Sequence, residues 1–173
     1  LIEYRDVEQV LEETEQRGEV PFLLMLDGVT DVRNLGAIAR SAECAGVHAL
    51  IVPQQSTAPI NQDAIRTSTG ALLKIPVCRV ANTKSLINQV KSFGLKVYAA
   101  TEKAKNDYTG MHATEPLMII MGNEERGINS SLIKMADELI SIPIKGDIES
   151  LNVSVAAGVL LYEVVRQREN ASK

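Results

Sequence analysis

Three polar stretches of the chain combine residue types that can hold a ligand or help to move a proton. Each follows closely on an apolar run that is typical of a buried strand. In chain order their members are Asp31, Asn34, Gly36 and Arg40; Gly122, Asn123, Glu124, Glu125, Arg126 and Gly127; and Ile142, Pro143, Ser150, Leu151, Asn152 and Ser154. Ligands of parallel α/β sheets bind outside the carboxyl ends of the strands, so the three stretches are placed to face one crevice.

Each stretch taken alone also has a purely structural explanation. Asn34 can cap a helix, and Arg40 can pair with Glu43 one turn later for at most ~0.5 kcal/mol. Glu124 can be a first-turn acid that favours the helix macrodipole, with Gly122 and Gly127 as turn residues. Ser150 and Asn152 are good helix caps that need no ligand to explain them. The joint occurrence of all three stretches at predicted strand ends favours a shared functional site.

Several common sites are excluded by what the motifs lack. The 11 glycines never occur as G-x-G, which removes the dinucleotide-binding fingerprint. Gly122 and Gly127 have the spacing of a phosphate-binding loop, but Ile128 stands where that motif needs lysine. The only histidines, His48 and His112, lack partners at metal-ligand spacing, so no metal is expected.

The elements that must position these stretches alternate along the chain. Strands are predicted at residues 22–26, 49–52, 75–80, 96–101, 117–121 and 138–144, and helices at 4–17, 34–45, 61–72, 83–93, 129–136 and 152–167. This order predicts an α/β fold with a mostly parallel sheet and helices on both faces. We expect residues 1–20 to form a helical arm or linker and residues 21–173 to form the main domain.

Charge is distributed unevenly over the 173 residues, whose formal net charge is −4. Residues 1–19 carry 7 acidic and 2 basic groups, and the remainder carries 15 acidic and 16 basic groups, a net charge of +1. The body therefore lacks the broad positive surface with which a protein grips RNA by charge alone. An RNA partner would require help from a second subunit or a further domain, and the start at Leu1 instead of Met is consistent with a fragment.

Compartment and cysteine usage set further expectations. No apolar run approaches the ~18 residues of a membrane-spanning helix, and the amino end does not resemble a signal peptide, so we expect a cytoplasmic protein without a membrane partner. Cys44 and Cys78 lie in apolar contexts and are expected to be buried.

The three stretches resemble the three motifs of the SpoU (TrmH) family of RNA 2′-O-ribose methyltransferases. The matching segments are Asn34–Arg40, Met121–Gly127, Ile142–Ile144 and Ser150–Ser154, and the resemblance extends over about residues 22–168. The flanking segments Leu26–Asp31 and Ser150–Ala157 look most like the branch that methylates a guanosine ribose in large-subunit (23S-type) ribosomal RNA. Members of that branch often carry an amino-terminal RNA-binding domain, which we expect this chain to lack.

The resemblance implies a SPOUT-type fold with a carboxyl-terminal trefoil knot, S-adenosylmethionine as methyl donor, and a homodimer that shares residues across its interface. By carry-over, the donor would be contacted by Met121, Gly122, Asn123, Ile142, Ile144 and Leu151, and the reacting end would be lined by Asn34, Arg40, Glu124, Ser150 and Asn152. Glu125 departs from the family, which often has a small residue there, and it is expected to narrow or charge the mouth of the site.

The implied reaction is attack of a ribose 2′-hydroxyl on the donor's sulfonium methyl group. A family proposal makes the arginine at Arg40 the base, but a guanidinium stays protonated in proteins. We therefore expect Arg40 to clamp an RNA phosphate, with Glu124 orienting Arg40 or the target nucleotide. Three alternatives remain open: the same chemistry on transfer RNA, a catalytically silent RNA-binding assembly factor, and a generic α/β nucleotide-binding domain.

Overall fold

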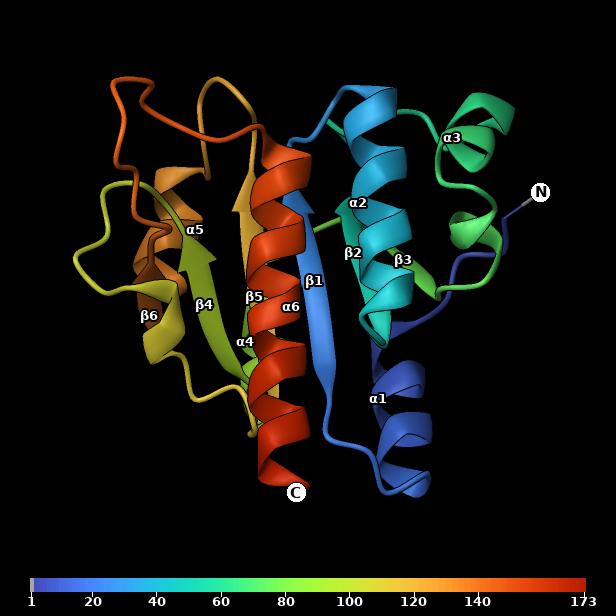
Figure 1. Ribbon diagram of the computed structural model, residues 1–173. Helices are drawn as coiled ribbons and strands as arrows, with labels where there is room; N and C mark the ends of the chain where they lie inside the picture. Colours follow the sequence, from blue (N-terminus) through green and yellow to red (C-terminus); the bar gives the residue numbers. More distant parts are fainter. Residues whose placement is uncertain (1) are drawn as a thin grey trace.

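The computed structural model describes residues 2–173 and contains one six-stranded sheet in which every strand pairs in parallel (Figure 1). The strand order is β3-β2-β1-β5-β4-β6. The strands are β1 (Phe22–Asp27), β2 (Ala49–Pro53), β3 (Val77–Val80), β4 (Lys96–Ala100), β5 (Leu117–Gly122) and β6 (Glu138–Ile140). The helices are α1 (Val7–Gln16), α2 (Val32–Cys44), α3 (Gln62–Thr67), α4 (Thr83–Ser92), α5 (Ser130–Met135) and α6 (Val153–Ala171), with short 3-10 turns η1 (Ala71–Leu73) and η2 (Tyr108–Gly110). The predicted parallel α/β fold is confirmed.

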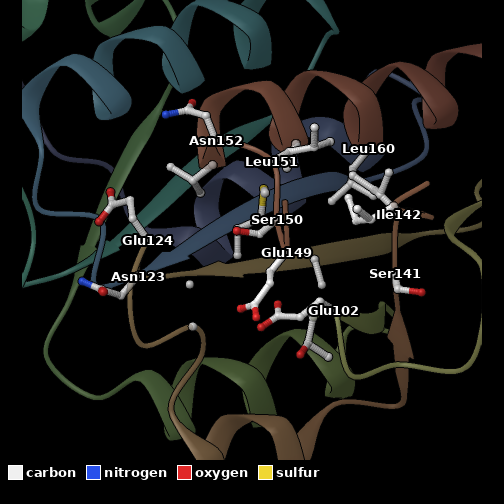
Figure 2. Close-up of a pocket in the computed structure, with 18 of the residues that line it drawn as sticks. Glu102, Asn123, Glu124, Ser141, Ile142, Glu149, Ser150, Leu151, Asn152 and Leu160 are labelled. Carbon is white, nitrogen blue, oxygen red and sulfur yellow. The ribbon is translucent and has the colours of Figure 1, made fainter. Parts of the chain in front are cut away.

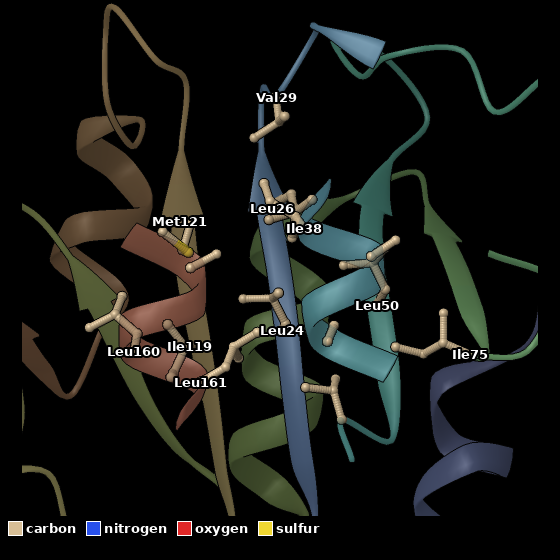
Figure 3. Packing of buried hydrophobic residues seen from close by; sticks show 14 of the residues in the cluster. Leu24, Leu26, Val29, Ile38, Leu50, Ile75, Ile119, Met121, Leu160 and Leu161 are labelled. Carbon is tan, nitrogen blue, oxygen red and sulfur yellow. The ribbon is translucent and has the colours of Figure 1, made fainter. Parts of the chain in front are cut away.

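Strands β1 and β5 form the centre of the sheet because their sequences are apolar on both faces. Leu24 pairs with Ile119 and points, with it, toward α2 and α6 (Figure 3). Their neighbours Leu23 and Met118 face a second core beneath α1, α4 and α5. Parallel strands that are buried on both faces read as continuous apolar runs, and that pattern is present in both segments.

The prediction that Asn34 caps a helix is wrong. Helix α2 begins two residues earlier, where the Asp31 carboxylate accepts hydrogen bonds from the backbone N–H groups of Arg33 (2.7 Å) and Asn34 (3.3 Å). The side-chain bond from Arg33 and these backbone bonds lower the pKa of Asp31. A carboxylate at this position satisfies two unpaired amides of the first turn, which leaves the Asn34 side chain free for other contacts.

Two further expectations need correction. Cys44 is exposed on the last turn of α2, whereas Cys78 is buried in β3, where desolvation raises its thiol pKa to about 12. Strand β6 ends at Ile140 instead of residue 144, because the chain beyond it bonds to a loop: Ser141 donates its N–H to the Asn106 carbonyl (2.9 Å).

Helix α1, which falls in the expected arm, packs directly against the sheet. Val7, Val10 and Leu11 are each no more than 3% exposed and share a core with Leu23 and Met25. The opposite face of the helix carries its acidic residues toward solvent. Helix α1 therefore contributes to the second core.

Within residues 2–173, no helix is both long enough and apolar enough to cross a membrane.

The amino edge of the sheet, where the strands begin, holds a polar cluster formed by Arg168, His48 and Glu19. Arg168 donates to the carbonyls of Val20, Pro21, Ala113 and Glu115 at 2.8 to 3.2 Å. The His48 Nδ1 accepts from the Phe22 N–H (3.0 Å), and its Nε2 lies 2.9 Å from Glu19 Oε1. Nearly every polar group in this cluster is occupied by a backbone partner or a carboxylate.

Candidate functional site

A tight loop follows β5 and is fastened by one side chain. Asn123 and Gly127 exchange two backbone hydrogen bonds of 3.0 and 2.9 Å. The Asn123 carboxamide accepts from the N–H groups of Glu125 (2.9 Å) and Arg126 (3.0 Å) and donates to the Gly28 carbonyl (2.8 Å). The Asn123 side chain is thus used to build the loop and join it to the end of β1.

Gly122 is required at the end of β5 because the loop folds back onto it. A Cβ at this position would lie 2.3 Å from the carbonyl carbon of Gly127 and 2.3 Å from the nitrogen of Ile128. No real Cβ tolerates such an approach, so the backbone closes only over glycine. Besides the expected contact with the donor, closure of this turn is therefore an independent reason for a glycine at position 122.

A pocket of about 570 Å³ opens at the carboxyl ends of β4, β5 and β6, beneath the start of α6 (Figure 2). Its lining residues come from four segments: Ala100–Glu102, Met121–Glu125 with Gly127, Ile140–Ile142 with Ile144, and Glu149–Val153 with Ala156 and Leu160. Ile142, Leu151 and Leu160 supply an apolar wall on one side, and Asn123, Glu124 and Asn152 lie on the other. The volume is in the range of pockets that hold small organic ligands.

A chain of hydrogen bonds joins all three polar stretches beside this pocket. The Asn34 Nδ2 donates to Glu124 Oε1 (3.2 Å), and the Asn152 Nδ2 donates to Asn34 Oδ1 (3.3 Å). Asn152 also caps α6, since its Oδ1 accepts from the N–H groups of Ser154 (2.9 Å) and Val155 (3.4 Å). Segments 90 and 118 residues apart in sequence therefore meet at one place.

Nine of the eleven residues proposed from the sequence line the pocket, and Asn34 and Arg40 do not. Met121, Gly122, Asn123, Glu124, Ile142, Ile144, Ser150, Leu151 and Asn152 all line the pocket. Asn34 does not line it but is bonded to two residues that do. Arg40 does not line the pocket either. It is exposed on α2, about 9 Å further along the helix axis than Asn34.

Among the lining residues that were not predicted from the sequence are two that follow β4 and one in the loop that leads to α6. Thr101 and Glu102 follow β4 directly, and Glu149 comes directly before Ser150; all three line the pocket. The rule that ligands lie beyond the carboxyl ends of strands applies to β4 as well, and would have identified Glu102.

The pocket is strongly acidic. Four of its lining residues are glutamates, at positions 102, 124, 125 and 149, and no Lys, Arg or His is among the lining residues. None of the four takes part in an ion pair within residues 2–173. A cationic or neutral ligand therefore fits this pocket better than an anion does. Across residues 2–173, no group of three or more His, Cys, Asp or Glu side chains is arranged to hold a metal.

Comparisons with known proteins agree with this geometry. A model of the SpoU rRNA Methylase family matches residues 21–162. The chain is 43% identical over 152 residues to the 23S rRNA (guanosine-2′-O-)-methyltransferase RlmB of Photorhabdus laumondii, covering 88% of this chain and 62% of that protein.

Two solved structures have a similar fold. The SpoU methyltransferase AviRb from Streptomyces viridochromogenes, in complex with the cofactor AdoMet, has a TM-score of 0.85 at 28% identity, with 97% of this chain and 66% of that chain covered. The AdoMet-bound rRNA methyltransferase from Sinorhizobium meliloti has a TM-score of 0.79 at 33% identity, with 85% and 56% covered. The chain therefore spans less than two thirds of the length of each of these relatives.

Proposed function

The chain belongs to the SpoU rRNA methylase family, and we propose that it transfers a methyl group from S-adenosylmethionine to a ribose 2′-hydroxyl of RNA. The observation that carries the proposal is the hydrogen-bonded chain from Glu124 through Asn34 to Asn152, beside a pocket of suitable size. A guanosine of 23S-type ribosomal RNA is the proposed target, because a relative at 43% identity carries that activity in its name. We place the reaction in the cytoplasm.

The donor pocket fits S-adenosylmethionine by size, shape and charge. When bound, S-adenosylmethionine supplies an electrophilic methyl group on a positively charged sulfur. Leu151, Ile142 and Leu160 offer an apolar wall for its base, and the turn after Gly122 offers backbone groups at close range. Met121, Asn123 and Ile144 complete the proposed donor contacts from the ends of β5 and β6.

The residues of the reacting end hold and orient the ribose. Asn34 is held by hydrogen bonds to Glu124 and Asn152. These side chains are therefore already ordered before the substrate binds, and little conformational entropy is lost on binding. Ser150 lines the same pocket and can donate its hydroxyl to the target nucleotide. Arg40 clamps an RNA phosphate from the exposed face of α2, and the hydroxyl proton leaves to a phosphate oxygen or to water.

A homodimer formed through α6 is part of the proposal. Val155 and Tyr162 are 53% and 48% exposed on that helix, and Leu151 just before it is 41% exposed. Helix α6 lies beside α2, the helix that carries Asn34 and Arg40, so a second copy packed there would also approach the reacting end (Figure 1). Sedimentation velocity is expected to show a dimer that the double variant Val155→Glu and Tyr162→Glu converts to a monomer.

The proposed fold includes a trefoil knot in residues 117–173. Strand β6 lies at the sheet edge beside β4, whereas α6 packs on the opposite side of β5 from that edge and against α2. The chain from Ser141 to Asn152 therefore crosses the ends of β4 and β5, past the loop after Gly122 (Figure 1). A chain pulled from both ends in a single-molecule experiment is expected to stop short of its full contour length if it is knotted.

We further propose that all residues needed for methyl transfer lie within 21–173, and that α1 contributes only packing.

The test of the whole proposal is transfer of tritium from labelled S-adenosylmethionine to 23S-type ribosomal RNA, with transfer RNA as a second substrate and mapping of the labelled nucleotide. Label on a guanosine ribose of ribosomal RNA is expected. Label on transfer RNA alone would reassign the substrate, and donor binding without any transfer would indicate a silent factor.

A further inference from the structure

Two glutamates of the donor pocket have no role in the reaction as described so far. Glu102 follows β4, and Glu149 lies on the approach to α6; Figure 2 shows their side chains pointing toward one another at one side of the pocket. Neither takes part in an ion pair within residues 2–173. Both side chains bring negative charge to the pocket, which therefore favours a ligand that carries positive charge.

The proposed reaction removes a positive charge from this pocket. As the carbon–sulfur bond breaks, its electron pair stays on sulfur and the sulfonium becomes a neutral thioether. The methyl carbon forms its new bond to the ribose oxygen, and the hydroxyl proton leaves to a phosphate oxygen or to water. The donor therefore carries one more positive charge than the demethylated product, at the same sulfur atom.

We infer that Glu102 and Glu149 make the pocket select the cationic donor over its neutral product. This inference rests on the proposed function and assigns a specificity role to two residues outside the reacting end. The attraction acts on the sulfonium through space and requires no contact with the methyl group. Because the product lacks the charge, the same two carboxylates favour its replacement by fresh donor after each turnover.

Screening sets the size of the effect. Both carboxylates are exposed to solvent, so their attraction for the sulfonium is that of charges near water, worth about threefold in affinity for each carboxylate. The preference is also expected to shrink as salt is added, because the Debye length falls from ~10 Å at 0.1 M to ~3 Å at 1 M ionic strength.

The test is calorimetric titration of the full chain with S-adenosylmethionine and, separately, with S-adenosylhomocysteine. The variants are Glu102→Gln, Glu149→Gln and the double variant, which keep side-chain size and remove charge. The matched control is the double variant Glu8→Gln and Glu12→Gln, which removes the same charge from the exposed face of α1. Thermal unfolding of each variant verifies that it is folded.

The measured quantity is the ratio of the product's dissociation constant to that of the donor. We expect this ratio to fall about threefold in each single variant and about tenfold in the double variant, with no change in the control. An unchanged ratio in the double variant, or an equal fall in the control, overturns the inference. Failure of the wild-type chain to bind either compound would contradict the proposed function instead, so the two failures are distinguishable.

Discussion

The two edges of the sheet each carry a cluster of polar residues, and the clusters differ in how much of their hydrogen-bonding capacity is in use. At the amino edge, Arg168 donates to four backbone carbonyls, and both His48 ring nitrogens have partners. At the carboxyl edge, Glu124 has one bond from Asn34, and its remaining capacity faces a pocket of about 570 Å³. Polar residues far apart in sequence meet in both places, but only the second cluster leaves groups available to a ligand.

This contrast separates structural from functional polar residues without reference to their type. Arg168 uses its guanidinium to hold two backbone segments together, and two of its four acceptors are partly buried, so losing these bonds costs stability. An arginine such as Arg40, which is exposed and whose side chain forms no ion pair within residues 2–173, is free to hold an anion. The predictions below test this division, beginning with the largest effect.

Gly122→Val is expected to disrupt the carboxyl edge most severely. Its Cβ would lie 2.3 Å from the backbone of Gly127 and Ile128, so the loop must rebuild, at a cost of about 3 kcal/mol or more in the free energy of unfolding. Donor binding should be lost with the loop. Denaturant unfolding and calorimetry measure the two effects. Gly146→Ala is the control, because a Cβ there meets nothing within 4 Å; wild-type stability in Gly122→Val would refute the loop geometry.

Arg40→Ala is expected to reduce methyl transfer at least about 100-fold while leaving donor binding and stability at wild-type level. Donor binding and stability should be unaffected because Arg40 is exposed on α2 and lies outside the donor pocket. Single-turnover methylation and calorimetry separate the two quantities. Arg40→Lys keeps the charge but loses the planar fork, so it should be intermediate. Full turnover by Arg40→Ala with saturating RNA would remove Arg40 from the mechanism.

Arg168→Met is expected to show the opposite pattern at the amino edge. Four carbonyls lose the hydrogen bond from Arg168, and of these Pro21 keeps the Leu117 N–H as a donor. The free energy of unfolding should fall by about 2 to 3 kcal/mol, while methylation per folded molecule is unchanged. Arg66→Ala is the control, since that exposed arginine bonds only Asp63 (3.2 Å), and it should cost less than about 0.5 kcal/mol. A larger loss of activity than of stability in Arg168→Met would contradict the division between the edges.

Asn34→Ala removes the link between Glu124 and Asn152 and is expected to lower methylation about 10- to 100-fold, with a change in stability below about 1 kcal/mol. Asn34→Asp is the matched variant, since it keeps the size but places a second carboxylate against Glu124. We expect it to be no more active than Asn34→Ala. Wild-type activity in either variant would show that the link has no role in positioning.

The smallest effect concerns pH. Burial lowers the pKa of His48 below its ordinary value of 6.5, and its Nδ1 accepts from the Phe22 N–H, which requires a neutral ring. As pH falls below 6.5, the unfolded chain takes up a proton before the folded chain does, so stability decreases. His48→Gln should flatten this part of the stability profile, measured by denaturant unfolding between about pH 7 and pH 5. An unaltered slope would contradict a buried, neutral His48.

Much of this arrangement follows from local sequence patterns, because those patterns report burial directly. The apolar runs at residues 22–26 and 117–121 correctly predict the strands β1 and β5, and Asn152 is correctly predicted to cap α6. The family resemblance is confirmed by the match over residues 21–162. The three polar stretches are brought together as predicted.

The structural features that could not be predicted from the sequence depend on contacts between distant segments. Asp31 and Asn34 are equally good caps by residue type, and only the position of Glu124 shows why the second has another partner. The role of Arg168 depends on four carbonyls from two other segments, which no periodicity reveals. Cys44 looks buried by its apolar neighbours, but its place on the outer face of the last turn of α2 exposes it.

The most direct test of the central claim is amide hydrogen exchange with and without S-adenosylmethionine. Binding at the carboxyl edge predicts slower exchange at residues 121–127, 140–144 and 149–153, with no change at residues 19–22, 47–49 and 113–116 at the amino edge. Donor binding that protects the amino edge, or that leaves exchange at residues 121–127, 140–144 and 149–153 unchanged, would contradict the account.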